Sequence, residues 1–414
     1  MCREGMDPDF MIISAGKICL LLGLLVPPML QPASAQQQPL VGNLAMIKDA
    51  ASEIAAGKLD HAEEELQFVL RSTPNEFHAL NLLAIVRAQQ KREEEAERLF
   101  QHVIALQPDY AGAHAGLGLL YVQMGTSDLA IPQLQEALRL DPGRSDAQAA
   151  LTTIWRDQAH AAVAQGELEK ALALLVEARK LTSSDPDVEY DFGLVALKMT
   201  LFTDAIDGFR QTLKLRANDP QALYGLGRAQ MSLAKFEDAH TTFERYLKLR
   251  PEDPSGHYAQ GMVLQALQRT SDARQEFNRS VQLQPQQTES YLQLGLIELE
   301  MGNLKEAREE FDRVLKRDPR HARALTGLGR VKFEEKDYAG AASLLTNAIA
   351  IAPRLREAHY YLGLTDARLG RKEESEKELQ IASELEHAEA EQQRNHLKIV
   401  DSDQLRVPAA PQSQ

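Results

Sequence analysis

Small and apolar residues recur along this chain at a fixed interval of 34 residues. The clearest series consists of glycines: Gly193, Gly227, Gly261, Gly295, Gly329 and Gly363. One interval upstream stands Ala159, and further upstream the same spacing links Ala50, Ala84 and Gly118. Self-similarity at a fixed period of this size indicates an array of structural repeats, each of them a small supersecondary unit.

Two further series share this period. Twelve residues after each member of the first series stands another small residue: Ala62, Ala96, Ala130, Ala171, Ala205, Ala239, Ala273, Ala307, Ala341 and Ser375. Four residues later comes a large apolar residue: Leu66, Phe100, Leu134, Leu175, Phe209, Phe243, Phe277, Phe311, Leu345 and Leu379. The pattern predicts two helices per unit, because small residues let helix axes approach and the large residue fills the space between neighbouring units.

Proline and glycine mark the expected ends of these helices. Proline closes many units: Pro74, Pro108, Pro142, Pro251, Pro285, Pro319 and Pro353. Glycine stands at the expected turn between the two helices of five units: Gly57, Gly125, Gly166, Gly302 and Gly370. The second helix should stop at the proline, and the turn should use the left-handed conformation that glycine adopts most easily.

With these features the sequence resembles the tetratricopeptide repeat family, whose 34-residue unit is a pair of antiparallel helices. The resemblance covers residues 43–389 and is best in the stretch LGLIELEMGNLKEAREEFDRVLKRDP, residues 294–319. It implies an all-α fold, a right-handed α-solenoid (superhelix) of about ten helix pairs. Each pair buries its face only by stacking on the next, so the array should fold as a quasi-one-dimensional unit.

One interval departs from the pattern. Gly118 and Ala159 are 41 residues apart, seven too many, which corresponds to about two extra helical turns. We therefore expect one longer helix from Ser145 to Gln165, which contains Trp155, the single tryptophan. This helix is either a joint between two groups of repeats or a longer helix without a separate role.

The expected organisation follows from these intervals. Repeats 1–3 occupy residues 43–144, a helix extension occupies 145–151, and repeats 4–10 occupy 152–389. The tenth repeat has His387 where proline is expected, so its second helix should run on to about Val400 as a polar cap. Residues 390–414 are thus read as a cap helix with a disordered tail.

The first 35 residues carry the features of a secretory signal peptide. Lys17 precedes the apolar run ICLLLGLLVPPML, and the small residues Ala33-Ser34-Ala35 follow it. We expect cleavage after Ala35 and a short linker at 36–42, with translation starting at Met1, Met6 or Met11. The apolar run is too short to span roughly 30 Å of hydrocarbon. The mature protein is thus expected in the periplasm or secreted, with membrane contact only through the cleaved leader.

The net charge and the positions of the cysteines disfavour several classes of partner and of chemical site. The formal net charge is -14, which disfavours a nucleic-acid partner because binding to phosphates requires a basic surface. Both cysteines, Cys2 and Cys19, fall in the expected leader. Disulfides, thiolate metal sites and cysteine nucleophiles are therefore not expected in the mature chain.

Catalytic and cofactor motifs receive no support. The G-x-G pairs, such as Gly225 and Gly227, lack the third glycine and the preceding strand of a dinucleotide site. His114, His257 and His359 share the fourth repeat position, which faces the helix-packing region, and no two histidines have metal-ligand spacing on one helix turn. We expect no cofactor, no metal and no enzymatic activity.

The candidate binding residues come from the resemblance. In this family the second, fifth, ninth, twelfth and thirteenth positions of the first helix face a concave groove. At positions five and nine this chain has an aromatic and basic set: Tyr190, Tyr224, Tyr258, Tyr360, Arg228 and Arg330. Tyrosines suit an extended peptide or a sugar chain, and arginine captures carboxylates. Alternatively, the tyrosines pack against the neighbouring repeat and only their hydroxyls reach water.

The function implied by the resemblance is a non-enzymatic scaffold that binds a protein or peptide segment in the groove, in envelope assembly or secretion. The family's carboxylate clamp, with lysine at position five and asparagine at position nine, is absent. The alternative is a scaffold that binds an envelope glycan in polysaccharide export. Binding through arginines should weaken as salt rises, whereas glycan binding should depend little on salt.

Overall fold

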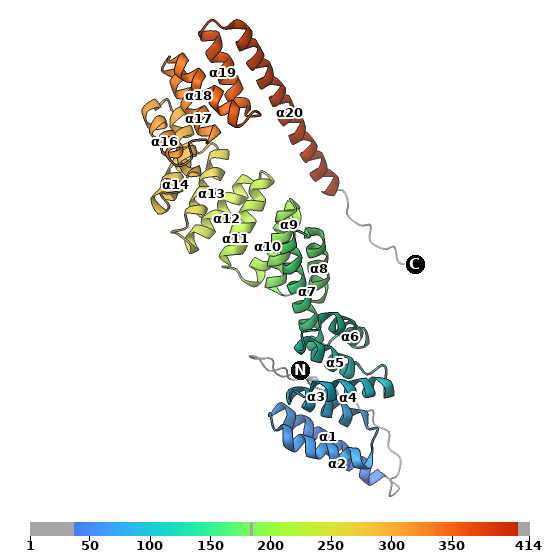
Figure 1. The fold of residues 1–414 in the computed structure, drawn as a ribbon. Helices are drawn as coiled ribbons and strands as arrows, with labels where there is room; N and C mark the ends of the chain where they lie inside the picture. The colour runs from blue at the N-terminus through green and yellow to red at the C-terminus, as the bar shows by residue number, and fades with distance from the viewer. Residues whose placement is uncertain (1–36, 183–184, 405–414) are drawn as a thin grey trace, which may run out of the picture. The chain divides into compact units, whose positions relative to one another are not determined.

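The computed structural model describes residues 37–182 and 185–404, and within them it contains twenty α-helices and no strand (Figure 1). From α1 to α10 and from α11 to α20, consecutive helices pack against each other in chain order. The chain forms two compact units, one ending at Arg216 and the other beginning at Ala217. The expected all-α array of repeated helix pairs is thereby confirmed.

Unit 1 contains five helix pairs, the first helix of each pair being odd-numbered. Its helices are α1 (Gln37–Ala55), α2 (Leu59–Ser72), α3 (Phe77–Gln89), α4 (Glu93–Leu106), α5 (Ala111–Gln123), α6 (Ser127–Leu140), α7 (Ser145–Gln165), α8 (Leu168–Leu181), α9 (Pro186–Lys198) and α10 (Phe202–Leu215). Most first helices have 13 residues and most second helices 14.

Unit 2 repeats the arrangement. Its helices are α11 (Pro220–Ser232), α12 (Phe236–Leu249), α13 (Pro254–Ala266), α14 (Thr270–Leu283), α15 (Glu289–Glu300), α16 (Leu304–Arg317), α17 (Ala322–Glu334), α18 (Tyr338–Ile351), α19 (Arg356–Arg368) and α20 (Lys372–Gln404). Asp219 and Asp253 cap α11 and α13 by accepting hydrogen bonds from main-chain N–H groups, and proline takes the first position of both helices, where no N–H is required.

The repeated series form the core of each helix pair. The alanines from Ala62 to Ala341 and the large residues from Leu66 to Leu345 are completely buried, as expected from their spacing. Glycine gives room where the large ring meets the first helix in repeat 8. A Cβ atom on Gly295 would lie 2.6 Å from the ring of Phe311, so a larger residue there would require the ring to shift. Repeat 2 has Ala84 at this position opposite the buried Phe100.

Every helix pair in the described residues turns through one residue in the left-handed region. Five of these residues are the expected glycines, such as Gly302 at φ 80°. The other five carry side chains: Lys91, Thr200, Ala234, Gln268 and Lys336, with φ between 54° and 67°. A backbone hydrogen bond closes each turn over five residues, for example from Leu201 N to Ala196 O at 2.9 Å, and this closure requires the left-handed residue.

Three helices, α1, α7 and α20, are longer than the others in the described residues. Helix α7 spans Ser145–Gln165 as one helix of 21 residues, the bounds expected from the sequence. Ala147 and Leu151 of its extension are buried in the same cluster as Trp155, so the extra turns are packed into the core of unit 1. Helix α1 begins at Gln37, inside the segment 36–42 expected as a linker, and proline is tolerated in its first turn.

The C-terminal helix α20 continues to Gln404, four residues beyond the expected end near Val400. The expected signal peptide at 1–35 and the end of the expected tail, 405–414, lie outside the described residues. Among the helices of the described part of the chain, none is long and apolar enough to cross a membrane.

Candidate functional site

Three of the four candidate tyrosines pack on the phenylalanine of their own repeat. The ring centroids of Tyr224 and Phe243 lie 5.8 Å apart, and those of Tyr258 and Phe277 also lie 5.8 Å apart. Tyr190 meets Phe209 at 5.9 Å. The partner is thus on the second helix of the same repeat, and each tyrosine ring is half-buried.

The surface around Tyr224 and Tyr258 in unit 2 combines aromatic and charged groups. Burial raises the pKa of both hydroxyls, and the electrostatic effect of Tyr224 adds to the rise in the pKa of Tyr258. The exposed Arg228, one turn after Tyr224 on α11, opposes the rise in the pKa of Tyr224. Arg323 has the same effect on Tyr258, while Glu289 has the opposite effect.

A tyrosine that the sequence did not single out supports this pair. The ring of Tyr246, on α12, lies 5.3 Å from that of Tyr224. Its hydroxyl donates a hydrogen bond to Asp253, which also caps α13 through Ser255 N at 3.0 Å. Burial, followed by this bond, strongly raises the pKa of Tyr246. This hydrogen bond links α12 to the start of α13 and positions the ring of Tyr246 against that of Tyr224.

Arg330 is already engaged by neighbouring side chains. Its Nη1 donates to Glu357 Oε1 at 2.5 Å, and its guanidinium lies 4.7 Å from the ring centroid of Tyr361. The side chain of Arg330 is 18% exposed. Tyr360, the predicted residue, is instead 43% exposed and touches Tyr361 edge-on.

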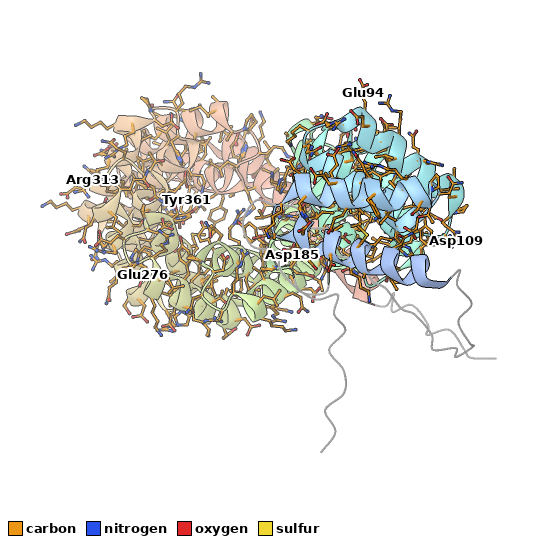
Figure 2. The ribbon with its side chains drawn as sticks, turned by 90° about the horizontal axis from the view of Figure 1, so that it is seen from below. Glu94, Asp109, Asp185, Glu276, Arg313 and Tyr361 are labelled. Atoms are coloured by element: carbon orange, nitrogen blue, oxygen red, sulfur yellow. The ribbon has the colours of Figure 1, made fainter. Side chains whose placement is uncertain are left out.

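The sequence analysis missed both partners of Arg330. Glu357 stands at the second repeat position, which the family pattern assigns to the groove, and that position could have drawn attention to it. Tyr361 stands at the sixth position and gave no such signal. In Figure 2 Tyr361 lies toward the middle of its helices, whereas Arg313 and Glu276 reach their outer edge.

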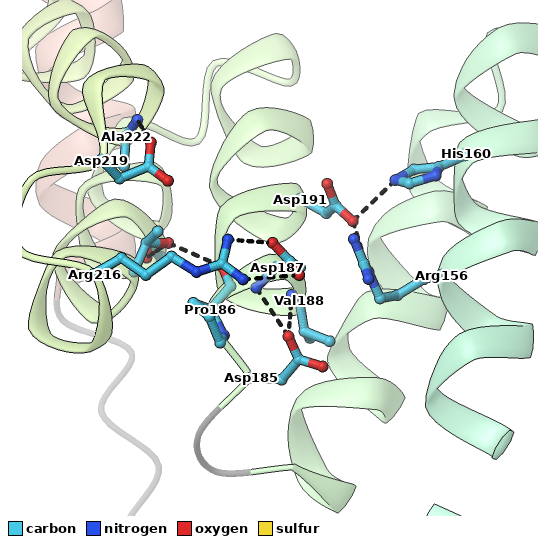
Figure 3. Close-up of polar contacts among 12 residues, drawn as sticks. Arg156, His160, Asp185, Pro186, Asp187, Val188, Asp191, Arg216, Asp219 and Ala222 are labelled. Carbon is cyan, nitrogen blue, oxygen red and sulfur yellow. Dashed lines mark hydrogen bonds and ion pairs between the residues drawn. The ribbon is translucent and has the colours of Figure 1, made fainter. Parts of the chain in front are cut away.

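The corresponding surface of unit 1 is organised by charge. Arg156, at the fifth position of repeat 4, donates from Nε to Asp191 Oδ2 at 2.9 Å (Figure 3). His160 Nε2 lies 2.9 Å from the same oxygen. Tyr190 belongs to this unit, whereas the other predicted residues belong to unit 2. Within unit 2, electrostatic effects link Arg228 to Tyr224 and Tyr224 to Tyr258, whereas Arg330 and Tyr360 are linked through Tyr361, which both contact.

One group of side chains has the composition of a metal site. Ligand atoms of Glu53 on α1 and of His61 and Glu65 on α2 all lie within 4.8 Å of one another, and zinc accepts such ligands. His61 is already paired with Glu53 at 2.6 Å, and its side chain is 61% exposed. The bond to Glu53 raises the pKa of His61, whereas burial raises that of Glu65. An ion pair beside a protonatable carboxyl accounts for this cluster, and we assign no metal to it.

The ion pair between Arg87 and Glu63 holds both of its members charged. Arg87 donates from Nη2 to Glu63 Oε1 at 2.6 Å, and a second nitrogen also contacts Glu63. This hydrogen bond raises the pKa of Arg87 and lowers that of Glu63. General acid–base catalysis needs a group that titrates near the working pH, so this pair is suited to connecting helices α2 and α3.

Comparison with family models decides the assignment. One tetratricopeptide repeat model matches residues 50–111, 190–233, 224–288 and 292–356, more than half of the chain, and a second matches residues 87–154. The chain belongs to the tetratricopeptide repeat family. Members of this family generally bind protein or peptide partners through a fold that is typically non-catalytic, and this tetratricopeptide repeat chain is a scaffold for protein–protein interaction.

Several solved tetratricopeptide repeat structures resemble parts of the chain. YrrB, described as having an unusual peptide-binding site, is 26% identical over 44% of this chain and 95% of its own, with a TM-score of 0.39. MamA from Desulfovibrio magneticus RS-1 is 22% identical over 41% of this chain and 97% of its own, at 0.40. PilF of Pseudomonas aeruginosa is 18% identical over 51% and 96%, at 0.45.

These TM-scores are too low to carry an argument about function. No curated protein sequence matches this tetratricopeptide repeat chain.

Proposed function

We propose that this chain is an exported, non-enzymatic scaffold that binds a peptide segment of a partner protein across Tyr224, Tyr258 and Arg228 in unit 2. The observation that carries the proposal is the pair of half-buried tyrosines at the same position of successive repeats. Each ring is held by a buried phenylalanine, so little side-chain entropy is lost when a ligand packs on its exposed part.

The surrounding charges favour a peptide over a glycan. Arg228 acts electrostatically on Tyr224, and Arg323 and Glu289 act on Tyr258. A peptide with polar main-chain groups and an acidic side chain can use both the phenols and an exposed guanidinium. Arg330 contributes less to carboxylate capture, because an incoming carboxylate would have to displace Glu357. A neutral envelope glycan would gain little from these charges and is the second candidate.

The cellular setting is part of the proposal. Residues 1–35 have the composition of a cleaved leader, which supports a periplasmic or secreted protein with a role in envelope assembly or secretion. N-terminal sequencing of the protein recovered from native cells tests this part. A mature terminus at Gln36 in an envelope fraction supports export, and an intact leader in the cytoplasmic fraction contradicts it.

The binding surface is tested by crosslinking capture from native envelope extract, followed by affinity measurement with the captured partner. The variant Tyr224→Ala/Tyr258→Ala is expected to weaken binding at least tenfold, because buried tyrosines often contribute more than 1 kcal/mol at interfaces. The matched control is Tyr224→Phe/Tyr258→Phe, which keeps the ring packing on Phe243 and Phe277 and removes only the hydroxyls.

The results of these binding experiments distinguish a peptide ligand from a glycan ligand. Equal binding by wild type and both variants, with unchanged helical content by circular dichroism, would contradict the surface assignment. Binding that weakens with salt and with Arg228→Gln supports a peptide ligand. Capture of no protein, together with salt-independent retention on envelope polysaccharide that the alanine variant loses, would replace the peptide by a glycan.

A further inference from the structure

Three histidines at the fourth repeat position form the same bridge. In each, Nε2 contacts the carbonyl oxygen of the proline six residues earlier, and Nδ1 contacts a side chain on the second helix of the same repeat. The Nε2 contacts are His114 to Pro108 at 2.9 Å, His257 to Pro251 at 2.9 Å and His359 to Pro353 at 3.0 Å. The Nδ1 contacts are to Gln133 at 2.9 Å, Glu276 at 2.6 Å and Glu378 at 2.6 Å. We call these contacts the histidine bridges.

Each histidine bridge joins three segments of the chain. In repeat 7, Pro251 lies just after α12, His257 lies on α13 and Glu276 lies on α14. The side chain of His257 is 12% exposed, and that of His359 is 5% exposed. A bridge therefore ties the end of one repeat to both helices of the next, and its strength affects how firmly adjacent repeats are joined.

Hydrogen-bond chemistry separates the three bridges into two kinds. A carbonyl oxygen only accepts, so Nε2 must carry a hydrogen in every bridge. A neutral imidazole has one N–H, which leaves Nδ1 as an acceptor. The amide of Gln133 can turn its NH₂ group toward His114 and donate. The carboxylates of Glu276 and Glu378 cannot donate, so their contacts require a proton on Nδ1 as well.

His257 faces charged and polar groups on the two segments packed against it, α14 and the loop before α13. Glu276 and Arg279 face it from α14, and the carbonyl of Pro251 faces it from the preceding loop. Burial lowers the pKa of His257, and so does Arg279, but the bonds to Glu276 and Pro251 outweigh them, and the pKa is raised. Arg279 is itself paired with Glu252 at 3.3 Å. Around His359, Glu378 is the facing carboxylate, and Glu378 in turn interacts electrostatically with Asp366.

We propose that the bridge at His257 is a proton-dependent contact that joins repeats 6 and 7 more firmly in mildly acidic conditions, whereas the bridge at His114 needs no second proton on its ring. The deprotonated ring would present a lone pair to a carboxylate at 2.6 Å, and the contact would open. Among the histidine bridges, the proton-dependent one at His257 lies in unit 2, and the bridge at His114 lies in unit 1.

The stability contributed by the bridge at His257 is greatest at low pH. Because the pKa of His257 in the folded state is raised above its unfolded value of about 6.5, the bridge contributes its full stability below that unfolded pKa. The contribution is lost as pH rises through the folded pKa. A consequence for peptide binding rests on the proposed function. Tyr258 follows His257 on α13, so opening the bridge would loosen the helix that carries this tyrosine.

The test measures ring protonation and local opening in the full chain without any ligand. Nitrogen NMR of the imidazole rings, recorded from pH 5.5 to 9 (about the range in which histidine titrates), should show His257 still doubly protonated at a pH where His114 carries hydrogen on Nε2 alone. Amide hydrogen exchange of α13 should lose protection on the order of tenfold above the transition, relative to α5.

Two reciprocal variants make the test decisive. Glu276→Gln copies the His114 bridge, and it should move the titration midpoint of His257 down and remove the pH response of α13. Gln133→Glu should raise the midpoint of His114 and give α5 the same response. If His257 and His114 titrate together in the wild type, or if neither variant moves its midpoint, the proposal is wrong. These readouts involve no partner, so they stand apart from the test of the proposed function.

Discussion

Repeats 5 and 8 build the same helix pair with glycine in different places. Repeat 5 consists of α9 and α10 in unit 1, and repeat 8 consists of α15 and α16 in unit 2. In both, a glycine on the first helix accommodates a buried phenylalanine ring: a Cβ on Gly193 would lie 3.0 Å from Phe209, and a Cβ on Gly295 would lie 2.6 Å from Phe311. The requirement for glycine at this contact is therefore common to both repeats.

The two repeats differ at two other positions. Repeat 5 has Gly208 on its second helix, where repeat 8 has Glu310, and it turns through Thr200, where repeat 8 turns through Gly302. Both turns close with the same backbone bond, at 2.9 Å to Ala196 O and at 2.8 Å to Glu298 O. Close approach of the two helices and the left-handed turn between them are therefore separate requirements. A helix pair forms even where a residue with a side chain, such as Thr200, adopts the strained left-handed conformation.

The largest effect is expected from Gly208→Ala. The added Cβ would lie 2.8 Å from Glu189 O and 2.9 Å from Gly193 N, and backbone atoms cannot move aside as a side chain can. We expect a loss of about 3 kcal/mol, measured by hydrogen exchange of α9 and α10 and by urea unfolding. The control is Gly42→Ala in α1, where the Cβ would meet nothing within 4 Å. Similar stability of the two variants would refute the close-approach argument.

Exchanging the turn residues should have the next largest effect. A left-handed conformation costs a residue with a side chain about 1–2 kcal/mol, and a β-branched residue pays most. Thr200→Gly should stabilise repeat 5 by about 1 kcal/mol, and Gly302→Thr should destabilise repeat 8 by about as much. The space around Gly302 is open within 4 Å, so the second change isolates the backbone. Thermal unfolding shifts of the same sign in both variants would contradict this account.

The smallest effect concerns Glu310, for which repeat 5 has no titrating counterpart. Burial raises its pKa, Glu298 and Glu309 add to the rise, and Arg313 opposes it at 2.8 Å. A raised folded pKa means that the native state binds the proton more tightly. Stability should therefore fall as pH increases from about 4.3, the unfolded value. Hydrogen exchange of α15 between pH 4 and 7 should show this fall in the wild type and lack it in Glu310→Gln. An identical pH profile in both proteins would rule out the effect.

Much of the fold could be predicted from sequence because the repeat demands the same residue at the same contact. The positions of Ala307 and Phe311, the five glycine turns and the bounds of α7 all follow from spacing. The turn at Thr200 could not be predicted, because its own preference opposes the conformation that the closing backbone bond imposes.

The candidate site shows more clearly which contacts could not be predicted from the sequence. Tyr224 and Tyr258 were found because they repeat at one position, whereas the engagement of Arg330 by Glu357 and Tyr361 involves three different positions on two helices. The shared fourth position of His257 was visible in the sequence. Its partners, a carbonyl of the preceding loop and a carboxylate 19 residues later, were not.

The repeat period, the small and large positions of the core and the family follow from the order of residues alone, since these contacts join residues at constant separations along neighbouring helices. Which charged groups meet, which hydroxyls are buried and which histidines require a second proton become apparent only in the folded chain. Those properties depend on distances of a few ångströms between long side chains and on exclusion of water from them, and one-dimensional spacing does not specify either.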